Sequence, residues 1–348
     1  MGGRAVSARA FLPGVHRALA PAKINLGLFV GPVRALEGLA RGGVPSGAPG
    51  AGDARAPGAG DGRHELVTVM QSISLADELT LRLAPAGTER DEVACPGVPG
   101  DPRENLAAAA LRLFREHTAW GAPPLRLDIV KRIPVAAGLG GGSADAAATL
   151  RLAAHASGLG DGQLLLELAA QLGADVPAQV SPGRWLATGA GERLQALPAP
   201  LSSFGVLVLA LDVPLSTAAV YAEGDRLETG RSLEELGERR RALHAALEHG
   251  EALPGAVELL HNDLQRAAVS LCPQIEDALA AALEAGALYA VLSGSGPTVL
   301  GLFSTPQGAR EGGARLPGRT PPPICAAPVD GAFARAVTLG AGSAPADR

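Results

Sequence analysis

A glycine-rich run near the middle of the chain constrains the fold more than any other feature. Four glycines fall within five positions, from Gly138 to Gly142. Alternating apolar residues over 125–133 predict a strand before the run, and residues 143–156 favour a helix with Ser143 as its N-cap. Glycines let backbone N–H groups approach a phosphate closely, and a helix N-terminus adds unpaired donors and partial positive charge. This order of strand, turn and helix therefore predicts a phosphate-binding loop.

The glycine-rich run does not match the residue spacing of two other phosphate-binding motifs. A P-loop requires a Lys directly before its Ser or Thr, and this run contains no Lys. A dinucleotide fingerprint that began at Gly138 would need a third glycine at position 143, where Ser143 stands. A turn that only joins the strand to the helix remains open as the alternative.

Three further features could take part in chemistry. Asp175 follows a predicted helix in a loop that Pro177 stiffens, so its carboxylate could accept or orient a hydroxyl proton. Lys23 lies on a strand predicted over 22–30, where an inward-facing lysine could neutralise phosphate. The loop 293–298 is rich in Gly and Ser, and its glycines permit close approach of a ligand. Each feature has a purely structural alternative. Asp175 could only form a turn, Lys23 could be solvated, and the loop 293–298 could be a plain hairpin-like turn.

Composition narrows the classes of function. The net charge is −5, which is not the basic footprint of a dedicated nucleic-acid binder. The three cysteines, Cys95, Cys272 and Cys325, lack metal-site spacing and fit a reducing compartment. No stretch approaches the roughly 18 apolar residues that a membrane helix needs. We therefore expect a cytoplasmic protein without membrane partners, with an N-terminal transit peptide as the alternative because arginines precede the first acid.

Strands and helices alternate without a repeating βαβ rhythm, which predicts an α+β fold. Residues 32–62 are dominated by Gly, Ala, Pro and Arg and predict a flexible insert. The tail after Ala336 is expected to fray. Strands are expected at 22–30, 64–70, 78–83, 125–133, 206–211, 288–292 and in a last segment ending at 303. Helices are expected from about residue 105, and at 143–156, 161–172, 216–221, 232–248 and 273–285.

Three motifs together resemble the GHMP kinases, the family of galactokinase, homoserine kinase and mevalonate kinase. Pro21-Ala-Lys-Ile-Asn-Leu, Gly138-Leu-Gly-Gly-Gly-Ser and Ser293-Gly-Ser-Gly-Pro-Thr occur in the family's order, and the match runs from about residue 21 to 303. The resemblance implies a two-domain fold with its active site in the cleft between the domains. A domain like domain 2 of ribosomal protein S5 is implied over 18–200, and a ferredoxin-like domain over 201–340.

Finer details resemble one branch of this family, which uses a cytidine diphosphate-linked methylerythritol. They are the segments that begin at Asp61, Leu172, Ser216 and Asn262. The resemblance implies that ATP phosphorylates the 2-hydroxyl of the methylerythritol, in the non-mevalonate isoprenoid pathway. A mevalonate or homoserine kinase remains the alternative enzyme. A catalytically silent nucleotide-binding protein on the same fold is the alternative from another class.

The resemblance also implies roles for individual residues. Asp175 matches the catalytic Asp of the family and Lys23 matches its partner. In the family the histidine at the position of His64 reads the cytosine edge, and Tyr221 is suited to stack on that base. The substrate-binding residues implied are Asn25, His64, Thr217 and Tyr221.

ATP and Mg²⁺ are the implied cofactors. Asn105 and Lys131 fall where the family approaches the nucleotide, and Ser143 is a candidate contact of Mg²⁺ or phosphate. The loop residues that match the family's ATP-phosphate loop are Pro134, Val135, Ala136, Ala137, Gly138, Leu139, Gly140, Gly141, Gly142, Ser143 and Ala144.

Two features depart from the family pattern. Arg63 stands where the family typically carries Tyr before the His, although a guanidinium plane can also stack on a base. The insert 32–62 comes directly before this segment and could alter or cover the substrate entrance. The expected partner is the small-molecule substrate, with no nucleic acid, and the expected state is a monomer or homodimer.

Overall fold

The computed structural model describes residues 11–34, 63–101, 104–253 and 257–339, arranged around two sheets. The strands are β1 (Val15–Val33), β2 (His64–Leu83), β3 (Glu92–Ala94), β4 (Leu125–Val130), β5 (Arg184–Gly189), β6 (Arg193–Leu197), β7 (Gly205–Leu209), β8 (Tyr289–Leu292), β9 (Val299–Phe303), β10 (Ile324–Ala326) and β11 (Val337–Leu339). The helices are α1 (Leu106–Thr118), α2 (Gly141–Ser157), α3 (Gly162–Leu172), α4 (Val176–Val180), α5 (Thr217–Arg226), α6 (Leu233–Leu247), η2 (Val257–Leu259), α7 (Gln265–Leu271), α8 (Gln274–Glu284) and α9 (Pro306–Ala314).

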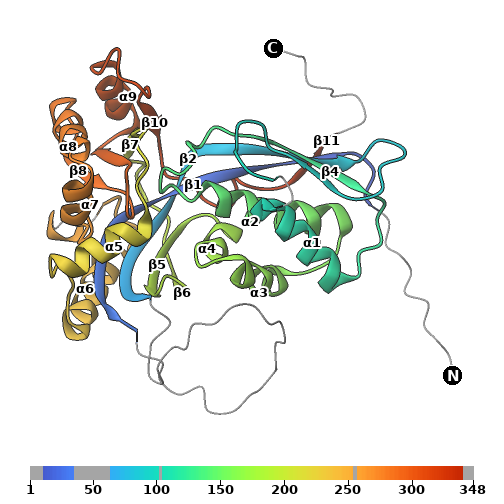
Figure 1. Cartoon of the computed structure of the whole chain (residues 1–348), viewed down its shortest axis with the longest axis horizontal. Helices are drawn as coiled ribbons and strands as arrows, with labels where there is room; N and C mark the ends of the chain where they lie inside the picture. Colours follow the sequence, from blue (N-terminus) through green and yellow to red (C-terminus); the bar gives the residue numbers. More distant parts are fainter. Residues whose placement is uncertain (1–10, 35–62, 102–103, 254–256, 340–348) are drawn as a thin grey trace.

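The larger sheet has seven strands and is built on the long antiparallel pair β1 and β2. The order runs β11-β1-β2-β4-β3, while β5 pairs with the first part of β2 and β6 pairs with β5. Only β3 and β4 pair in parallel. Helices α1 to α4 lie together on one side of this sheet (Figure 1).

Strand β1 is buried on both faces over residues 20–31, whereas its alternation of aliphatic residues with Lys23, Asn25 and Gly27 predicts a strand with one buried face. Helix α2 packs against the strand, and the segment after η2 pairs with its backbone at Leu28. The Leu28 N–H donates to the His261 carbonyl at 2.8 Å, and the Asp263 N–H donates to the Leu28 carbonyl at 2.9 Å. Gly27 permits this approach, because a Cβ there would lie 2.3 Å from the Leu259 carbonyl oxygen.

Helix α2 is the buried helix of the larger domain and consists largely of alanine. All of residues 144–150 are buried, including Asp145 and Thr149. Alanine loses no side-chain entropy in a helix, and its small side chain lets the helix backbone lie close to the sheet. A core poor in aromatic residues can therefore still be closely packed.

The smaller sheet has the strand order β10-β7-β9-β8 and is antiparallel throughout. Strands β7 and β9 are buried along their whole length. Helices α8 and α9 pack on this sheet, and α5 packs on α7. Figure 1 shows this sheet and its helices at the opposite end of the molecule from α1.

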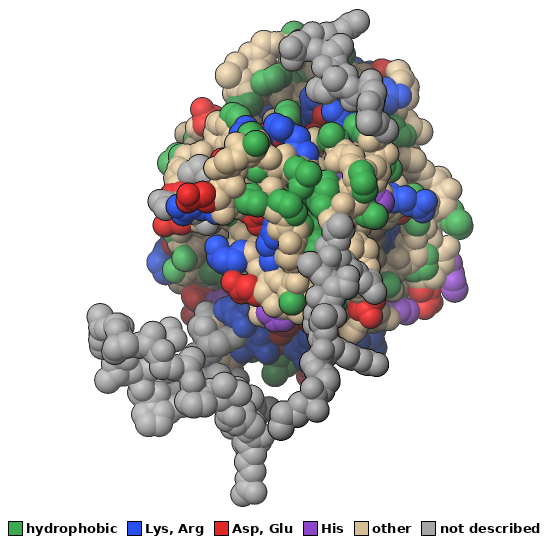
Figure 2. Space-filling view, turned by 90° about the vertical axis from the view of Figure 1, so that its right-hand side faces the viewer, with side chains coloured by type: hydrophobic (Ala, Val, Ile, Leu, Met, Phe, Trp, Pro, Cys, Tyr) green, Lys and Arg blue, Asp and Glu red, His purple; other side chains and the backbone are tan. Residues whose placement is uncertain are grey.

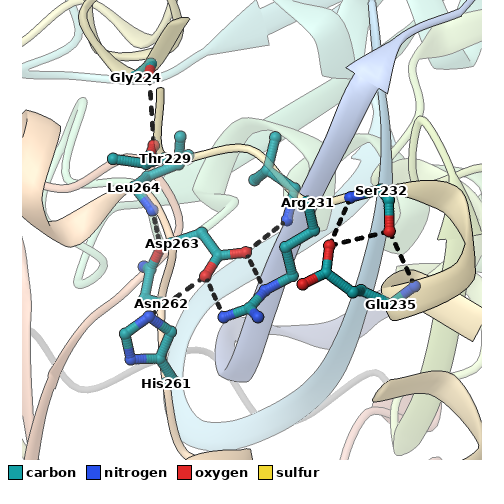
Figure 3. Close-up of polar contacts among 10 residues, drawn as sticks. Gly224, Thr229, Arg231, Ser232, Glu235, His261, Asn262, Asp263 and Leu264 are labelled. Atoms are coloured by element: carbon teal, nitrogen blue, oxygen red, sulfur yellow. Dashed lines mark hydrogen bonds and ion pairs between the residues drawn. The ribbon is translucent and has the colours of Figure 1, made fainter. Parts of the chain in front are cut away.

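A buried ion pair joins the two parts of the fold. Asp263 accepts from the Val30 N–H at 3.0 Å, at the end of β1. Both Nε and Nη2 of Arg231 donate to the same carboxylate at 2.7 Å, so the pair is bidentate (Figure 3). The next residue, Ser232, caps α6 in a capping box with Glu235, which Figure 3 also shows. The start of α6 is thereby fixed against the first sheet.

The expected elements agree with the structure at most positions, and the differences have identifiable causes. Strands expected at 64–70 and 78–83 are one strand, because Gln71 and Ser72 continue the pairing with β1 although they are polar and buried. Strand β1 extends to Val33, into the segment expected to be a flexible insert, and residues 35–62 of that insert lie outside the described residues. The tail does not simply fray after Ala336, since β11 pairs with β1. Sequence reasoning missed β3, β5, β6, β10, β11, α4, α7 and α9.

The surface carries both signs of charge. On the face shown in Figure 2, a group of hydrophobic side chains is bordered by basic and acidic side chains, and no continuous basic surface is visible there. No helix in the described part of the chain is long and apolar enough to cross a membrane.

The domain limits expected at 18–200 and 201–340 stay a prediction. The expected boundary lies in the segment between β6 and β7.

Candidate active site

The glycine-rich loop joins β4 to α2 and adopts the conformation that its glycines allow. Gly138 and Gly140 have φ values of 73° and 70°, in the left-handed region. A Cβ at Gly138 would lie 2.8 Å from the Gly296 carbonyl oxygen, so the loop touches the loop 293–298. The second and third of the three motifs, which begin at Gly138 and Ser293, therefore meet in space.

Helix α2 begins two residues earlier than expected. Its N-cap is Gly140, which has no side chain to satisfy the first N–H groups, and Ser143 is the third helical residue. The expectation of Ser143 as the N-cap is wrong, because glycine in the left-handed region starts the helix sooner. The N–H groups of the first turn have no partner within the helix, and no capping side chain takes their place. They remain suited to a phosphate.

A cavity of about 540 Å³ opens over this loop. Asn105 and Lys131 line it, and their contact with a nucleotide stays a prediction. Asn105 is the N-cap of α1, and its Oδ1 accepts from the Ala107 N–H at 2.9 Å. Ala144 is buried and does not line the cavity. The loop residues that line it are Pro134, Val135, Ala136, Ala137, Gly138, Leu139, Gly140, Gly141, Gly142 and Ser143.

Two buried aspartates hold Lys131 beneath the loop. Lys131 Nζ lies 2.5 Å from Asp77 Oδ2 and 2.8 Å from Asp145 Oδ2. Asp77 is fully buried and also accepts from the N–H groups of Arg132 and Ile133. Burial would lower the pKa of Lys131, but the hydrogen bonds and charges of the two aspartates raise it, so the ammonium stays charged. A fixed cation therefore lies beside the start of α2.

Asp145 has an unusual carboxyl group. Burial raises its pKa to about 7, against the opposing effect of Lys131 and with a further contribution from Asp77. Its Oδ1 is buried and has no hydrogen-bond partner. Sequence reasoning missed Asp77 and Asp145. The available signal for Asp145 was an aspartate among the alanines that follow the glycine-rich loop.

A second cavity, of about 330 Å³, adjoins the first. Gly138 and Gly140 line both cavities, so the glycine-rich loop separates them. The second cavity brings together all but one of the expected catalytic and substrate residues. They are Lys23, Asn25, Asp175, Thr217 and Tyr221.

Lys23 lines the second cavity beside Gly140, one of the two glycines that line both cavities. Its Nζ is 3.5 Å from Asp175 Oδ2 and donates to Asn25 Oδ1 at 3.0 Å. Asn25 in turn donates to Thr68 Oγ1 at 2.8 Å, so the amide is held with its oxygen toward the lysine. Lys23 and Asn25 lie on the same face of β1, as the two-residue period predicted. A Cβ at Gly140 would lie 3.0 Å from Lys23 Cγ.

Asp175 and the loop 293–298 complete the second cavity. Asp175 precedes α4, and its side chain is 35% exposed, which leaves the carboxylate accessible. Asn262 Nδ2 donates to the carbonyls of Leu292 and Gly294 at 2.8 Å and holds the loop in place. Sequence reasoning gave Asn262 only as part of a resembling segment, and the structure shows what its amide does.

His64 and Tyr221 lie at the outer end of the second cavity. Their ring centroids are 5.1 Å apart, and the planes are tilted by 33°. Burial and then the negative charge of Asp175 raise the pKa of the Tyr221 phenol to about 12, so it stays protonated at neutral pH. His64 does not line the cavity itself, and Arg63 is exposed beside it.

Among the described residues, no group of three or more His, Cys, Asp and Glu side chains could hold a metal ion. A Mg²⁺ that arrives with a nucleotide needs few protein ligands, because phosphate oxygens and waters supply the others. Ser143 lines the first cavity and Asp145 carries the unpartnered oxygen, so oxygen donors of the kind Mg²⁺ prefers are present. The assignment of Ser143 as a metal contact stays a prediction.

The sequence matches two family profiles. The profile described as "GHMP kinases N terminal domain" matches residues 105–183. The profile described as "GHMP kinases C terminal" matches residues 231–319. The first match contains the glycine-rich loop and Asp175, and the second contains the loop 293–298. Lys23, Asn25, His64, Thr217 and Tyr221 lie outside both matched regions.

Curated relatives and solved structures agree with these matches. The 4-diphosphocytidyl-2-C-methyl-D-erythritol kinase of Gloeobacter violaceus is 43% identical over 242 residues, or 69% of this chain and 78% of the relative. The enzyme of the same name from Anaeromyxobacter dehalogenans is 38% identical over 86% of this chain and 85% of the relative.

A crystal structure of 4-(cytidine 5'-diphospho)-2C-methyl-D-erythritol kinase has a TM-score of 0.65 and 32% identity, and the alignment covers 90% of this chain and 99% of that one. Homoserine kinase from Cytophaga hutchinsonii has the same TM-score at 16% identity, covering 97% of this chain and all of that one, and shares the fold. The chain therefore belongs to the GHMP kinases and, within them, to the 4-diphosphocytidyl-2-C-methyl-D-erythritol kinase family.

Proposed function

We propose that the protein transfers the γ-phosphate of ATP to the 2-hydroxyl of 4-diphosphocytidyl-2-C-methyl-D-erythritol, a step in the non-mevalonate isoprenoid pathway. One observation carries the proposal: two cavities meet at Gly138 and Gly140, and Lys23 and Asp175 line the second one, with Lys23 beside Gly140. One cavity suits a nucleotide and the other suits an alcohol. The identity of the alcohol follows from the names of the relatives.

The first cavity supplies the groups that would hold ATP. N–H groups of the loop and the first turn of α2 face the phosphates, and the helix dipole adds partial positive charge. Lys131, fixed by its two aspartates, places an ammonium group beside the start of this helix. Mg²⁺ would be held by the phosphates and Ser143, and when bound it spreads the charge of the transferring group.

The second cavity supplies the groups that would act on the alcohol. Asp175 takes or orients the proton of the attacking hydroxyl, and Lys23 orients Asp175 and stabilises the developing negative charge. Asn25 fixes the lysine by accepting a hydrogen bond from its ammonium. Thr217, Tyr221 and His64 hold the remainder of the substrate. Catalysis then consists of in-line positioning and charge stabilisation.

The test is ADP release with Mg-ATP and 4-diphosphocytidyl-2-C-methyl-D-erythritol, with mevalonate and homoserine as parallel acceptors. The proposal expects turnover confined to the cytidyl substrate. Turnover of mevalonate or homoserine in its place would reject the acceptor and keep the phosphate site. ATP binding without release of ADP on any acceptor would reject the enzyme activity. The cytoplasmic location and the monomeric or dimeric state stay predictions.

A further inference from the structure

Helix α5 presents three polar side chains at a spacing of four residues, Thr217, Tyr221 and Asp225. This spacing places them along one face of the helix, and 1.5 Å per residue separates the first from the last by about 12 Å. Thr217 Oγ1 lies 2.8 Å from Ser295 Oγ, beside the glycine-rich loop. Asp225 lies at the far end, where its Oδ2 is 3.4 Å from His64 Nε2. The face thus runs from the phosphate-transfer end of the cavity to the His64 end.

The hydrogen bonds of His64 fix which ring nitrogen carries a proton. Nδ1 lies 2.8 Å from the Gly31 carbonyl oxygen, which can only accept, so Nδ1 must be the donor. Nε2 is therefore the nitrogen that faces Asp225 and any ligand. The His64 side chain is 10% exposed and the Asp225 side chain is 58% exposed. The histidine is a fixed part of the wall, and the carboxylate is open to a ligand.

The two groups form a hydrogen-bonding pattern that distinguishes cytosine from uracil. An ionised Asp225 can only accept, and the 4-amino group of cytosine is a donor. His64 Nε2 donates to the cytosine N3 when it is protonated, and accepts from the same amino group when it is not. Uracil carries a carbonyl at position 4, which would face the carboxylate with no proton between them. Tyr221, 5.1 Å from His64, supplies the aromatic wall.

We propose that Asp225 accepts a hydrogen bond from the 4-amino group of the substrate's cytosine, next to His64 Nε2, and so selects cytidine over uridine. This inference rests on the proposed function, which puts a cytidyl group in this cavity. Sites that hydrogen-bond a substrate group reject analogues strongly when the site is dry. Asp225 is more than half exposed, so water can replace part of the lost bond. The discrimination from this residue is about tenfold to a hundredfold.

The first test compares kcat/KM for the cytidine diphosphate-linked substrate and its uridine counterpart. Asp225→Asn is expected to reduce the preference for cytidine about tenfold, mainly through KM, because the base lies far from the reacting hydroxyl. Asp225→Glu keeps an acceptor and is expected to restore part of the preference. Glu234→Gln, an exposed carboxylate at the start of α6, is the control and leaves the preference unchanged. An unchanged preference in active Asp225→Asn enzyme would overturn the assignment.

The second test measures binding of cytidine diphosphate and uridine diphosphate by calorimetry, and needs no turnover. Tighter binding of cytidine diphosphate by the wild type, lost in Asp225→Asn, supports the inference even if the proposed reaction fails. Equal loss of affinity for both nucleotides in Asp225→Asn would show a structural role for Asp225 and overturn the inference. Equal binding of both nucleotides by the wild type would overturn it as well.

Discussion

Single residues decide the chemistry of this site through the partners that fix them. Lys23 is held between Asn25 and Asp175, and Lys131 is held between Asp77 and Asp145. The first lysine lines the second cavity, and the second lysine lines the first cavity. The proposed function gives them different roles, Lys23 toward the acceptor and Lys131 toward the nucleotide.

Asp175→Asn tests the proton-transfer role directly. Loss of the carboxylate is expected to lower kcat by about 10²–10⁴, the usual effect of removing a general acid or base. ATP affinity is expected to stay within a few-fold, because Asp175 does not line the first cavity. Both quantities come from steady-state ADP release and nucleotide titration. Asp212→Asn, in an exposed loop, is the matched control. A variant at position 175 with near-full turnover would contradict the role.

Asp145 predicts a specific dependence of stability on pH. Its folded pKa of about 7 is above the ordinary value of 3.8, so the folded state binds this proton more tightly than the unfolded state. The contribution to stability is present below about pH 4 and is lost as the pH rises toward 7. We expect the unfolding free energy of Asp145→Asn, measured in urea, to fall less between pH 5 and pH 8 than that of the wild type. Identical pH profiles would contradict the raised pKa.

Among the elements, the glycine-rich loop is held by its contact with the loop 293–298. Sequence reasoning predicted both loops and the elements beside them, because periodicity and glycine spacing are local signals. It could not predict that Gly138 touches Gly296, nor that α2 begins at Gly141. Contacts between distant segments leave no periodicity in either segment.

Gly138→Ala tests the loop conformation. A Cβ there meets a carbonyl oxygen at 2.8 Å, and the φ value of 73° disfavours alanine. We expect a loss of about 1–3 kcal/mol in unfolding free energy, measured by urea denaturation. Gly142→Ala is the matched comparison, because a Cβ at Gly142 meets nothing within 4 Å and lies inside a helix. It is expected to raise stability by about 0.5–1 kcal/mol. Equal effects of the two substitutions would contradict the loop geometry.

At the scale of the whole molecule, two sheets are joined through the segment 261–264 and the bidentate Arg231–Asp263 pair (Figure 3). Burial alone would raise the pKa of Asp263, but hydrogen bonds from His261, Arg231 and the Val30 N–H lower it. The stability it contributes is therefore present above pH 4 and is lost as the pH falls through the lowered folded pKa.

Arg231→Ala is expected to destabilise the protein by about 3 kcal/mol, because it leaves a buried carboxylate without its cation. Urea denaturation at neutral pH measures the change. Arg226→Ala removes a similar bidentate pair with Glu223 at the surface, where the arginine side chain is 66% exposed. That variant is expected to change stability little. A loss at position 231 no larger than the loss at position 226 would contradict a role for the pair in joining the sheets.

The sequence allowed the fold class and most of the site to be predicted, but not how the parts meet. Lys23, Asp175 and the loop were named from motifs, and the second cavity brings them together. Asp225 and Asp77 were missed, since each contacts a residue distant in sequence, His64 and Lys131. The spacing of Asp225 from Tyr221 was the one local signal available for it.

The most direct test of the central claim follows the phosphate from ATP to the product by ³¹P and ¹H NMR. The protein is incubated with Mg-ATP and 4-diphosphocytidyl-2-C-methyl-D-erythritol. The account predicts a new phosphomonoester on carbon 2 of the methylerythritol, formed in step with ADP, with the cytidyl diphosphate intact. Inorganic phosphate and ADP without this phosphomonoester, or a phosphate on another hydroxyl, would contradict it.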